Sequence, residues 1–201
     1  MSALFTQVGF QHVALVGLGG KGKAQVALKL AYTVKAKHAE YSVFWLTAAS
    51  IDEFRNSCKE LTLALGINTS DSDDPRMLVK NYLDANMCGI WLLILDNADD
   101  TGIFDAVDKE SRISTFLPQS KEERIISTTR SKKVSWLAVE RDSLELEELS
   151  PQDLPTILMR SVEGLNNESH LRDEPSIKNL LDELYHLPLA VAQAADYVAV
   201  N

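Results

Sequence analysis

The stretch GLGGKGKA at residues 17–24 is the part of this 201-residue chain that most constrains its fold. It matches the phosphate-binding pattern G-x-x-x-x-G-K-[ST] at every position except the last. In that pattern the backbone N–H groups of the loop surround phosphate oxygens, and the lysine reaches the terminal phosphates. The Ser/Thr hydroxyl ligates Mg2+, but Ala24 has no hydroxyl. The stretch therefore indicates nucleotide binding strongly and nucleotide hydrolysis weakly.

The segments on either side of the glycines favour a phosphate loop over a plain glycine-rich turn. Residues 12–16, HVALV, form the short apolar run typical of a buried parallel strand. Apolar side chains then recur at helical spacing over residues 22–36; they are Val26, Ala27, Leu30, Ala31 and Val34. A helix in this place directs its free N–H groups and the positive end of its dipole toward bound phosphate.

This arrangement predicts a set of phosphate-contacting residues at the loop and the start of the helix. They are Gly17, Leu18, Gly19, Gly20, Lys21, Gly22, Lys23, Ala24 and Gln25. Lys21 adds a positive charge beside the phosphates, which we expect to offset part of the loss at Ala24.

Composition restricts the possible partners of the chain. A hydrophobic content of 45% is enough for a substantial core in one or two domains. The formal charge of −9 argues against a general affinity for nucleic acid, because binding phosphate backbones needs concentrated Lys and Arg. No apolar run approaches the ~18 residues of a membrane span, and no signal peptide is evident. With two cysteines, read as buried thiols, the chain is expected in the cytoplasm and not at a membrane.

The order of predicted elements gives the fold class. Further strands are expected at residues 41–47, 90–96, 124–129 and 143–149, with helices at 51–65, 75–86 and 101–108. From Pro151 onward only helices are expected, at 153–164, 176–186 and 188–199. The prediction is an α/β protein with a P-loop NTPase three-layer αβα architecture and a mainly parallel sheet, over residues 1–149. A small all-helical subdomain would follow at residues 150–201.

The apolar strand at 90–96 ends in Asp96, which predicts a metal-holding carboxylate of the Walker B type beside the phosphates. The next position, where many hydrolytic enzymes have an acid, is Asn97, whose amide orients water but cannot accept its proton. Asp99 and Asp100 are equally well explained as substitutes for that acid or as helix-capping and solvent-facing residues. Arg130 follows the strand at 124–129, so it is either a γ-phosphate contact or a surface charge.

Together these motifs resemble the NB-ARC domain of the STAND class of signalling ATPases, particularly the fungal NLR-like branch. The matching segments are residues 17–23, VFWLTAA at 43–49, WLLILDNADD at 91–100, STTR at 127–130 and HLPL at 186–189. The resemblance implies a role for Asp96 and Asn97 in catalysis and for Arg130 as a γ-phosphate sensor. It also places Pro188 near the adenine base and makes residues 150–201 similar to the helical ARC1 subdomain.

The family resemblance implies a switch in which ADP holds the module closed and ATP permits opening and self-association. The implied partners are adenine nucleotide, other copies of the chain, and the effector and repeat domains of a larger receptor. Three positions depart from the family pattern, namely Lys21, Ala24 and His186. Ala24 implies a weakened Mg2+ site beside the bound ADP or ATP.

Three functions remain open from the sequence. The first is a nucleotide-dependent switch that hydrolyses ATP slowly. The second is a catalytically inert P-loop scaffold for protein interaction, which Ala24 and Asn97 both favour. The third is a small-molecule kinase, which the absence of an Arg-rich lid or acceptor site after the core makes the weakest of the three.

Overall fold

The structure is a computed structural model of the 201-residue chain. It describes residues 11–70, 72–119, 124–134, 143–146, 174–184, 188–191 and 193–194. These residues belong to two compact units. The first contains residues up to Val16 and from Lys23 to Glu145, and the second combines Gly17–Gly22 with residues from Leu146 onward. The predicted domain boundary at residues 149 and 150 stays a prediction.

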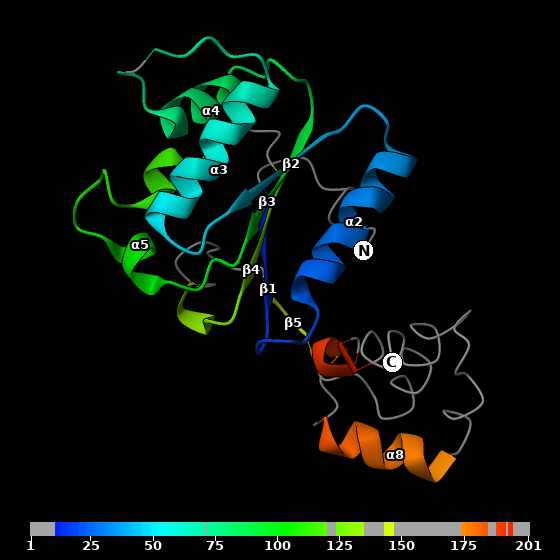
Figure 1. Ribbon diagram of the computed structural model, residues 1–201. Coiled ribbons are helices and arrows are strands. Elements are labelled where there is room, and N and C mark those ends of the chain that lie inside the picture. Colours follow the sequence, from blue (N-terminus) through cyan, green and yellow to red (C-terminus); the bar gives the residue numbers. More distant parts are fainter. Residues whose placement is uncertain are drawn as a thin grey trace. The chain divides into compact units, whose positions relative to one another are not determined.

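A five-stranded sheet forms the centre of the first unit, with strand order β2-β3-β4-β1-β5 (Figure 1). The strands are β1 (Gln11–Val16), β2 (Ser42–Thr47), β3 (Trp91–Asp96), β4 (Arg124–Thr129) and β5 (Ser143–Glu145). All four neighbouring pairs are parallel. Because parallel strands need crossovers, this topology brings the carboxyl ends of β1, β3 and β4 to the same edge of the sheet.

Helices cover both faces of this sheet, which confirms the predicted three-layer αβα architecture (Figure 1). Helix α2 (Lys23–Lys37) packs on one face through the predicted apolar stripe, of which Ala27, Leu30, Ala31 and Val34 are buried. The opposite face is covered by α3 (Ile51–Ala64), α4 (Pro75–Asp84) and α5 (Thr101–Asp105). Strand β3 is buried on both faces, as its uniformly apolar sequence predicts.

Local sequence signals explain where several helices begin and end. Ser50 caps α3 by accepting a hydrogen bond from the backbone N–H of Glu53, as predicted from the S-x-x-E pattern. Gly66 follows the end of α3 at a φ of 66°. Asp74 caps α4 and Pro75 occupies its first turn, where no backbone donor is needed.

The sequence patterns predicted two elements, α5 and β5, to be longer than they are. Helix α5 ends at Asp105 and not at residue 108, because Ala106 adopts non-helical backbone angles, with φ −50° and ψ 132°. The carboxylate of Asp108 then accepts hydrogen bonds from Glu110 N–H and the Ser111 hydroxyl, which form a turn. Strand β5 ends at Glu145, four residues before the predicted end.

The cysteine prediction is correct for one thiol and wrong for the other. Cys58 is buried, and burial raises the pKa of its thiol to about 12, so it is unreactive at neutral pH. Cys88 is only half-buried.

The second unit is described in part. Helix α8 (Glu174–Glu183) corresponds to the helix predicted at 176–186, and residues 188–191 are also helical. The helix predicted at 153–164 lies outside the described residues, as does His186. Among the helices that the structure describes, none combines the length and the apolar character that crossing a membrane requires.

Candidate functional site

The glycine loop of residues 17–22 has a backbone conformation that its glycines make possible. Gly20 and Gly22 both have a φ of 79°, in the left-handed region that side-chain-bearing residues rarely adopt. Such turns direct successive backbone N–H groups toward one point and create an anion-binding concavity. The backbone of this loop therefore favours glycine at positions 20 and 22.

The segment that contains Pro188 lies against this loop. The backbone N–H of Leu189 donates a hydrogen bond of 3.2 Å to the carbonyl of Gly20. Pro188 is the neighbour of Leu189 in the helical residues 188–191. The structure thus brings the predicted phosphate contact and the neighbourhood of Pro188 together across 169 positions of sequence.

Helix α2 begins at Lys23, directly after the last glycine of the loop. Lys23 and Ala24 are half-buried, whereas Gln25 is exposed. No acidic side chain lies in the first turn to neutralise the positive end of the helix dipole. At Ala24 the chain presents a methyl group where the phosphate-loop pattern has a metal-binding hydroxyl.

The carboxyl ends of β3 and β4 hold Asp96 in a defined position. Its Oδ1 accepts a hydrogen bond of 2.6 Å from the hydroxyl of Thr128, which is almost fully buried. The same Thr128 oxygen accepts a hydrogen bond of 2.9 Å from the backbone N–H of Asn97. Thr128 therefore orients the carboxylate of Asp96, the predicted Walker B residue, and fixes the first residue of the turn that follows it.

Asn97 occupies an unusual backbone conformation for its position. Its φ is 62°, a region that Asn tolerates better than most residues, and its side chain is exposed. The turn it creates is attached to β4 by a hydrogen bond of 2.8 Å from Ala98 N–H to the Thr128 carbonyl. The backbone conformation by itself therefore favours Asn at position 97, whether or not its side chain orients water.

Asp99 and Asp100, for which the sequence left two explanations, have different partners. The carboxylate of Asp99 accepts hydrogen bonds from the backbone N–H and from the Nε of Arg130, both at 2.5 Å. Asp100 accepts a 2.7 Å hydrogen bond from Gly102 N–H and caps α5. Helix capping explains Asp100, whereas Asp99 belongs to the end of the sheet that carries Arg130.

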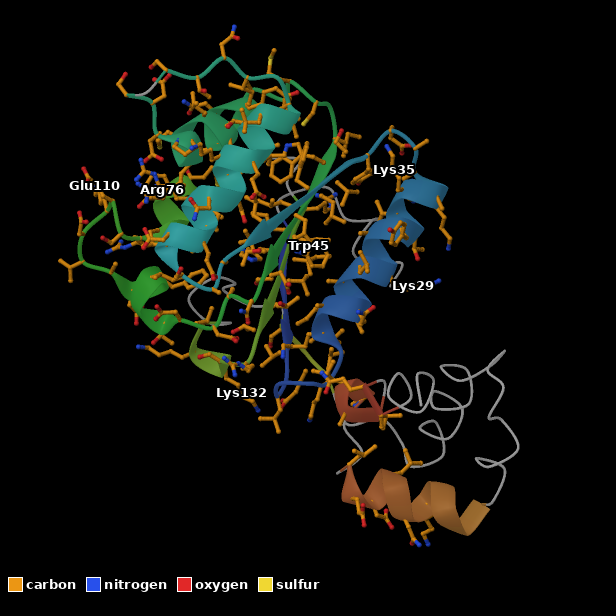
Figure 2. The ribbon with its side chains drawn as sticks, in the orientation of Figure 1. Lys29, Lys35, Trp45, Arg76, Glu110 and Lys132 are labelled. Carbon is orange, nitrogen blue, oxygen red and sulfur yellow. The ribbon has the colours of Figure 1, made fainter. Side chains whose placement is uncertain are left out.

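Further ion pairs surround this edge of the first unit. Lys132, which Figure 2 labels just beyond the end of β4, contacts Glu145 at 3.0 Å, and Lys133 contacts Asp105 at 2.6 Å. By contrast, Arg76 lies on the α4 side of the molecule, where it donates to the Glu110 carbonyl and stacks on Phe116 (Figure 2). Arg76 therefore supports packing, away from the carboxyl end of the strands.

A buried polar pair links β1 to β4 below this edge. His12 Nε2 lies 3.1 Å from the hydroxyl of Ser127, and both residues are buried. Burial lowers the pKa of His12 to about 4, so the imidazole is neutral at physiological pH. His12, Thr128 and the contact of Asp99 with Arg130 were not found by sequence reasoning; the only signal was the run of hydroxyl residues STT before Arg130.

The side chains available to bind a metal at this site fit an Mg2+ ion that is held mainly by phosphate and water. Among the residues that the structure describes, no group of three or more His, Cys, Asp or Glu side chains is placed to bind a metal ion. Mg2+ is ordinarily held by one or two carboxylates together with substrate phosphates, and Asp96 supplies one such carboxylate. Of the two positions that the sequence pattern assigns to the metal, Asp96 has a carboxylate and Ala24 has no side-chain ligand.

Comparison with known proteins agrees with this geometry. Residues 1–167 match the family model of the NB-ARC domain. An NLR-like nucleotide-binding leucine-rich repeat protein of Hyaloscypha variabilis is 34% identical over 95% of this chain. The chain spans only 20% of the length of that relative.

Two solved structures share the fold at low sequence identity. Cdc6p of Pyrobaculum aerophilum has a TM-score of 0.61 and 15% identity over 98% of this chain and 59% of its own. The ORC2 protein of Aeropyrum pernix has a TM-score of 0.56 and 11% identity over 98% of this chain and 64% of its own. The chain belongs to the NB-ARC domain family and has the P-loop NTPase fold.

Proposed function

We propose that this chain is the adenine-nucleotide switch module of an NLR-like signalling protein, binding ADP or ATP and hydrolysing ATP slowly or not at all. The observation that carries the proposal is the loop with left-handed Gly20 and Gly22, inserted between a buried parallel strand and a helix that opens with Lys23. This order of strand, loop and helix produces a phosphate-binding site at a helix N-terminus. The membership in the NB-ARC family supports the same function.

Each residue of the site has a proposed task. The backbone of residues 17–22 and the side chain of Lys23 bind the phosphates, with Lys21 adding charge. Asp96 holds the water shell of Mg2+, and Thr128 fixes the carboxylate that does so. When bound, Mg2+ neutralises charge on the phosphate oxygens. Arg130 contacts the γ-phosphate and thereby distinguishes ATP from ADP.

Slow hydrolysis follows from what the site lacks. Ala24 removes one ligand of Mg2+, and Asn97 has an amide where a carboxylate would accept the proton of the attacking water. The carboxylate of Asp99 is already engaged by Arg130, and that of Asp100 caps α5. These contacts support a module that is built to bind nucleotide and not to turn it over.

We further propose that Pro188 contacts the adenine from the segment of residues 150–201. The bond between Leu189 N–H and the Gly20 carbonyl supports this role, because it attaches the Pro188 segment to the phosphate loop. Exchange of ADP for ATP would then be communicated to residues 150–201, and through them to copies of the chain and to the effector and repeat domains of the longer protein. The required physical condition is a difference in nucleotide affinity between the two states.

Thermal unfolding with and without nucleotide tests the proposal. A ligand that binds only the folded chain stabilises it by about 2.7 kcal/mol at a concentration of one hundred times its Kd. We expect ADP and ATP to raise the Tm, and GDP to raise it much less. A Tm that no nucleotide changes would contradict the proposal.

The inert P-loop scaffold is a second candidate because Ala24 and Asn97 both depart from a hydrolytic site. It predicts that neither ADP nor ATP changes the Tm. It also predicts that Lys23→Ala alters nothing except stability. The same unfolding experiment therefore separates the two functions.

A further inference from the structure

The contact between Asp99 and Arg130 does more than neutralise two surface charges. One carboxylate oxygen of Asp99 accepts the backbone N–H of Arg130, and the other accepts the Nε of the same residue. The carboxylate thus holds both the base and the head of one side chain. An arginine held at two points loses most of its freedom to rotate about the bonds between them.

The placement of Asp99 itself is determined by the turn after β3. Asn97 enters that turn at a φ of 62°, and its N–H is bound by the Thr128 hydroxyl. Ala98 N–H is bound by the Thr128 carbonyl, so two consecutive residues before Asp99 are attached to β4. The carboxylate therefore reaches Arg130 from a backbone that is anchored to the strand preceding that arginine.

The way Asp99 binds Arg130 leaves the phosphate-binding end of the guanidinium available. Asp99 uses Nε, and among the described residues no hydrogen bond to the terminal nitrogens Nη1 or Nη2 is found. The side chain of Arg130 is 61% exposed, whereas that of Asp99 is 16% exposed. The terminal nitrogens carry four of the five N–H donors and form the fork that matches phosphate oxygens.

We propose that Asp99 is a positioning residue that holds the Arg130 guanidinium ready for the γ-phosphate and so sets the preference of the module for ATP over ADP. This inference rests on the proposed function, because it requires that the chain binds adenine nucleotides. It extends that function by making the discrimination depend on a residue that does not touch the nucleotide.

Positioning and competition predict opposite results for the same variant. If Asp99 orients Arg130, then Asp99→Asn frees the guanidinium and weakens binding of a triphosphate. If Asp99 only competes with phosphate for the positive charge, the same change strengthens it. Because the pair is mostly exposed on the arginine side, its removal costs little stability and the variant is expected to fold.

The experiment measures the Kd of ADP and of the non-hydrolysable triphosphate AMP-PNP by calorimetry. The proteins are the wild type, Asp99→Asn, Arg130→Ala and the double variant. The matched control is Asp100→Asn, which removes the same charge one position away and still caps α5, since Asn is as good an N-cap as Asp.

We expect Asp99→Asn to weaken AMP-PNP binding about tenfold, the effect of losing one well-oriented charged hydrogen bond, and to change ADP binding less than twofold. Arg130→Ala is expected to do the same, and the double variant no more than either single change. Asp100→Asn is expected to match the wild type.

Three results would overturn the inference while leaving nucleotide binding established. The first is tighter AMP-PNP binding in Asp99→Asn, and the second is an equal loss of affinity for ADP and AMP-PNP in that variant. The third is a ratio of the two Kd values in Asp99→Asn that equals the ratio in Asp100→Asn. A wild-type chain that binds neither nucleotide would instead refute the proposed function, and this inference with it.

Discussion

Two regions of the molecule differ in how completely they match the P-loop sequence pattern and its partner residues. One is the glycine loop with the start of α2, and the other is the pair of carboxyl ends of β3 and β4. The loop keeps the left-handed glycines and Lys23 but has Ala24 at the metal-ligand position. The end of β3 and β4 is fully connected, with Asp96 bound to Thr128 and Asp99 bound to Arg130. If the proposed function is right, we expect this chain to retain phosphate binding and the γ-phosphate contact more completely than hydrolysis.

The largest expected effect tests the loop. Lys23→Ala should weaken ADP binding by about 4 kcal/mol, close to a thousandfold, because it removes charged hydrogen bonds to two phosphates. Calorimetric titration with ADP measures the change. Lys29→Ala is the control, since Lys29 is exposed on α2 (Figure 2) and lies outside the loop. Equal ADP binding in the two variants would refute the placement of the phosphate site.

The second prediction concerns the buried link between β1, which leads into the loop, and β4, which leads to Arg130. The pKa of His12 is lowered from 6.5 to about 4, so the unfolded chain binds a proton that the folded chain does not over this interval. The contribution of His12 to the free energy of unfolding is therefore fully present above pH 6.5 and is lost as the pH decreases toward 4. The loss should be about 3 kcal/mol, measured by urea unfolding at several pH values.

Two variants show whether His12 causes this pH dependence. His12→Gln removes the titrating group and should flatten the stability profile between pH 6.5 and 4. The control is His38→Gln, at a partly exposed histidine that directly follows the C-terminal end of α2. Identical profiles for all three proteins would exclude His12 as the source.

The third prediction tests the joined strand ends. Thr128→Val keeps the shape of the side chain but leaves Asp96 and Asn97 N–H without their hydroxyl partner, so the free energy of unfolding should fall by about 2 kcal/mol. Mg2+-dependent ATP affinity should fall with it, because the carboxylate loses its orientation. Thr128→Ser should restore both quantities.

A neighbouring residue provides the control for Thr128. Thr129 is equally buried, and its hydroxyl accepts the backbone N–H of Ser131. Thr129→Val should therefore reduce stability without changing the Mg2+ dependence of binding. A loss of Mg2+ dependence in both variants would mean that Thr128 acts on stability alone.

The smallest expected effect restores the missing hydroxyl of the loop. Ala24→Thr should strengthen Mg2+-dependent ATP binding by about 1 kcal/mol, roughly fivefold, by returning one ligand to the metal. Ala24→Val has the same branched shape and no hydroxyl, so it separates coordination from packing. An equal effect of the two substitutions, measured by titration with and without Mg2+, would remove Ala24 from the metal site.

Sequence patterns predicted the fold because burial of one face of an element makes apolar residues recur at regular spacing in the sequence. The stripe of α2 and the uniformly apolar β3 are both direct consequences of which side chains face the core. Strand β4 was predicted with its observed bounds, Arg124–Thr129. The ends of α5 and β5 were missed because local turn hydrogen bonds, such as those of Asp108, decide them.

The candidate site was predictable in its motifs and not in its contacts. Nothing in the sequence shows that Asp99 binds Arg130, 31 positions away, and not an adjacent helix end as Asp100 does. That choice depends on the left-handed turn at Asn97 and on the register of β3 against β4. The same register places Thr128 beside Asp96. The spacing of these two residues along the sequence does not predict that contact.

Calorimetric titration of the nucleotide-free chain with ADP and ATP, each with and without Mg2+, tests the central claim most directly. We expect both nucleotides to bind without Mg2+, and Mg2+ to change their affinities only a few-fold, because we propose that the glycine loop and Lys23 bind the phosphates and because Ala24 offers the metal no ligand. Silence in all four titrations, or binding that requires Mg2+, would contradict this account.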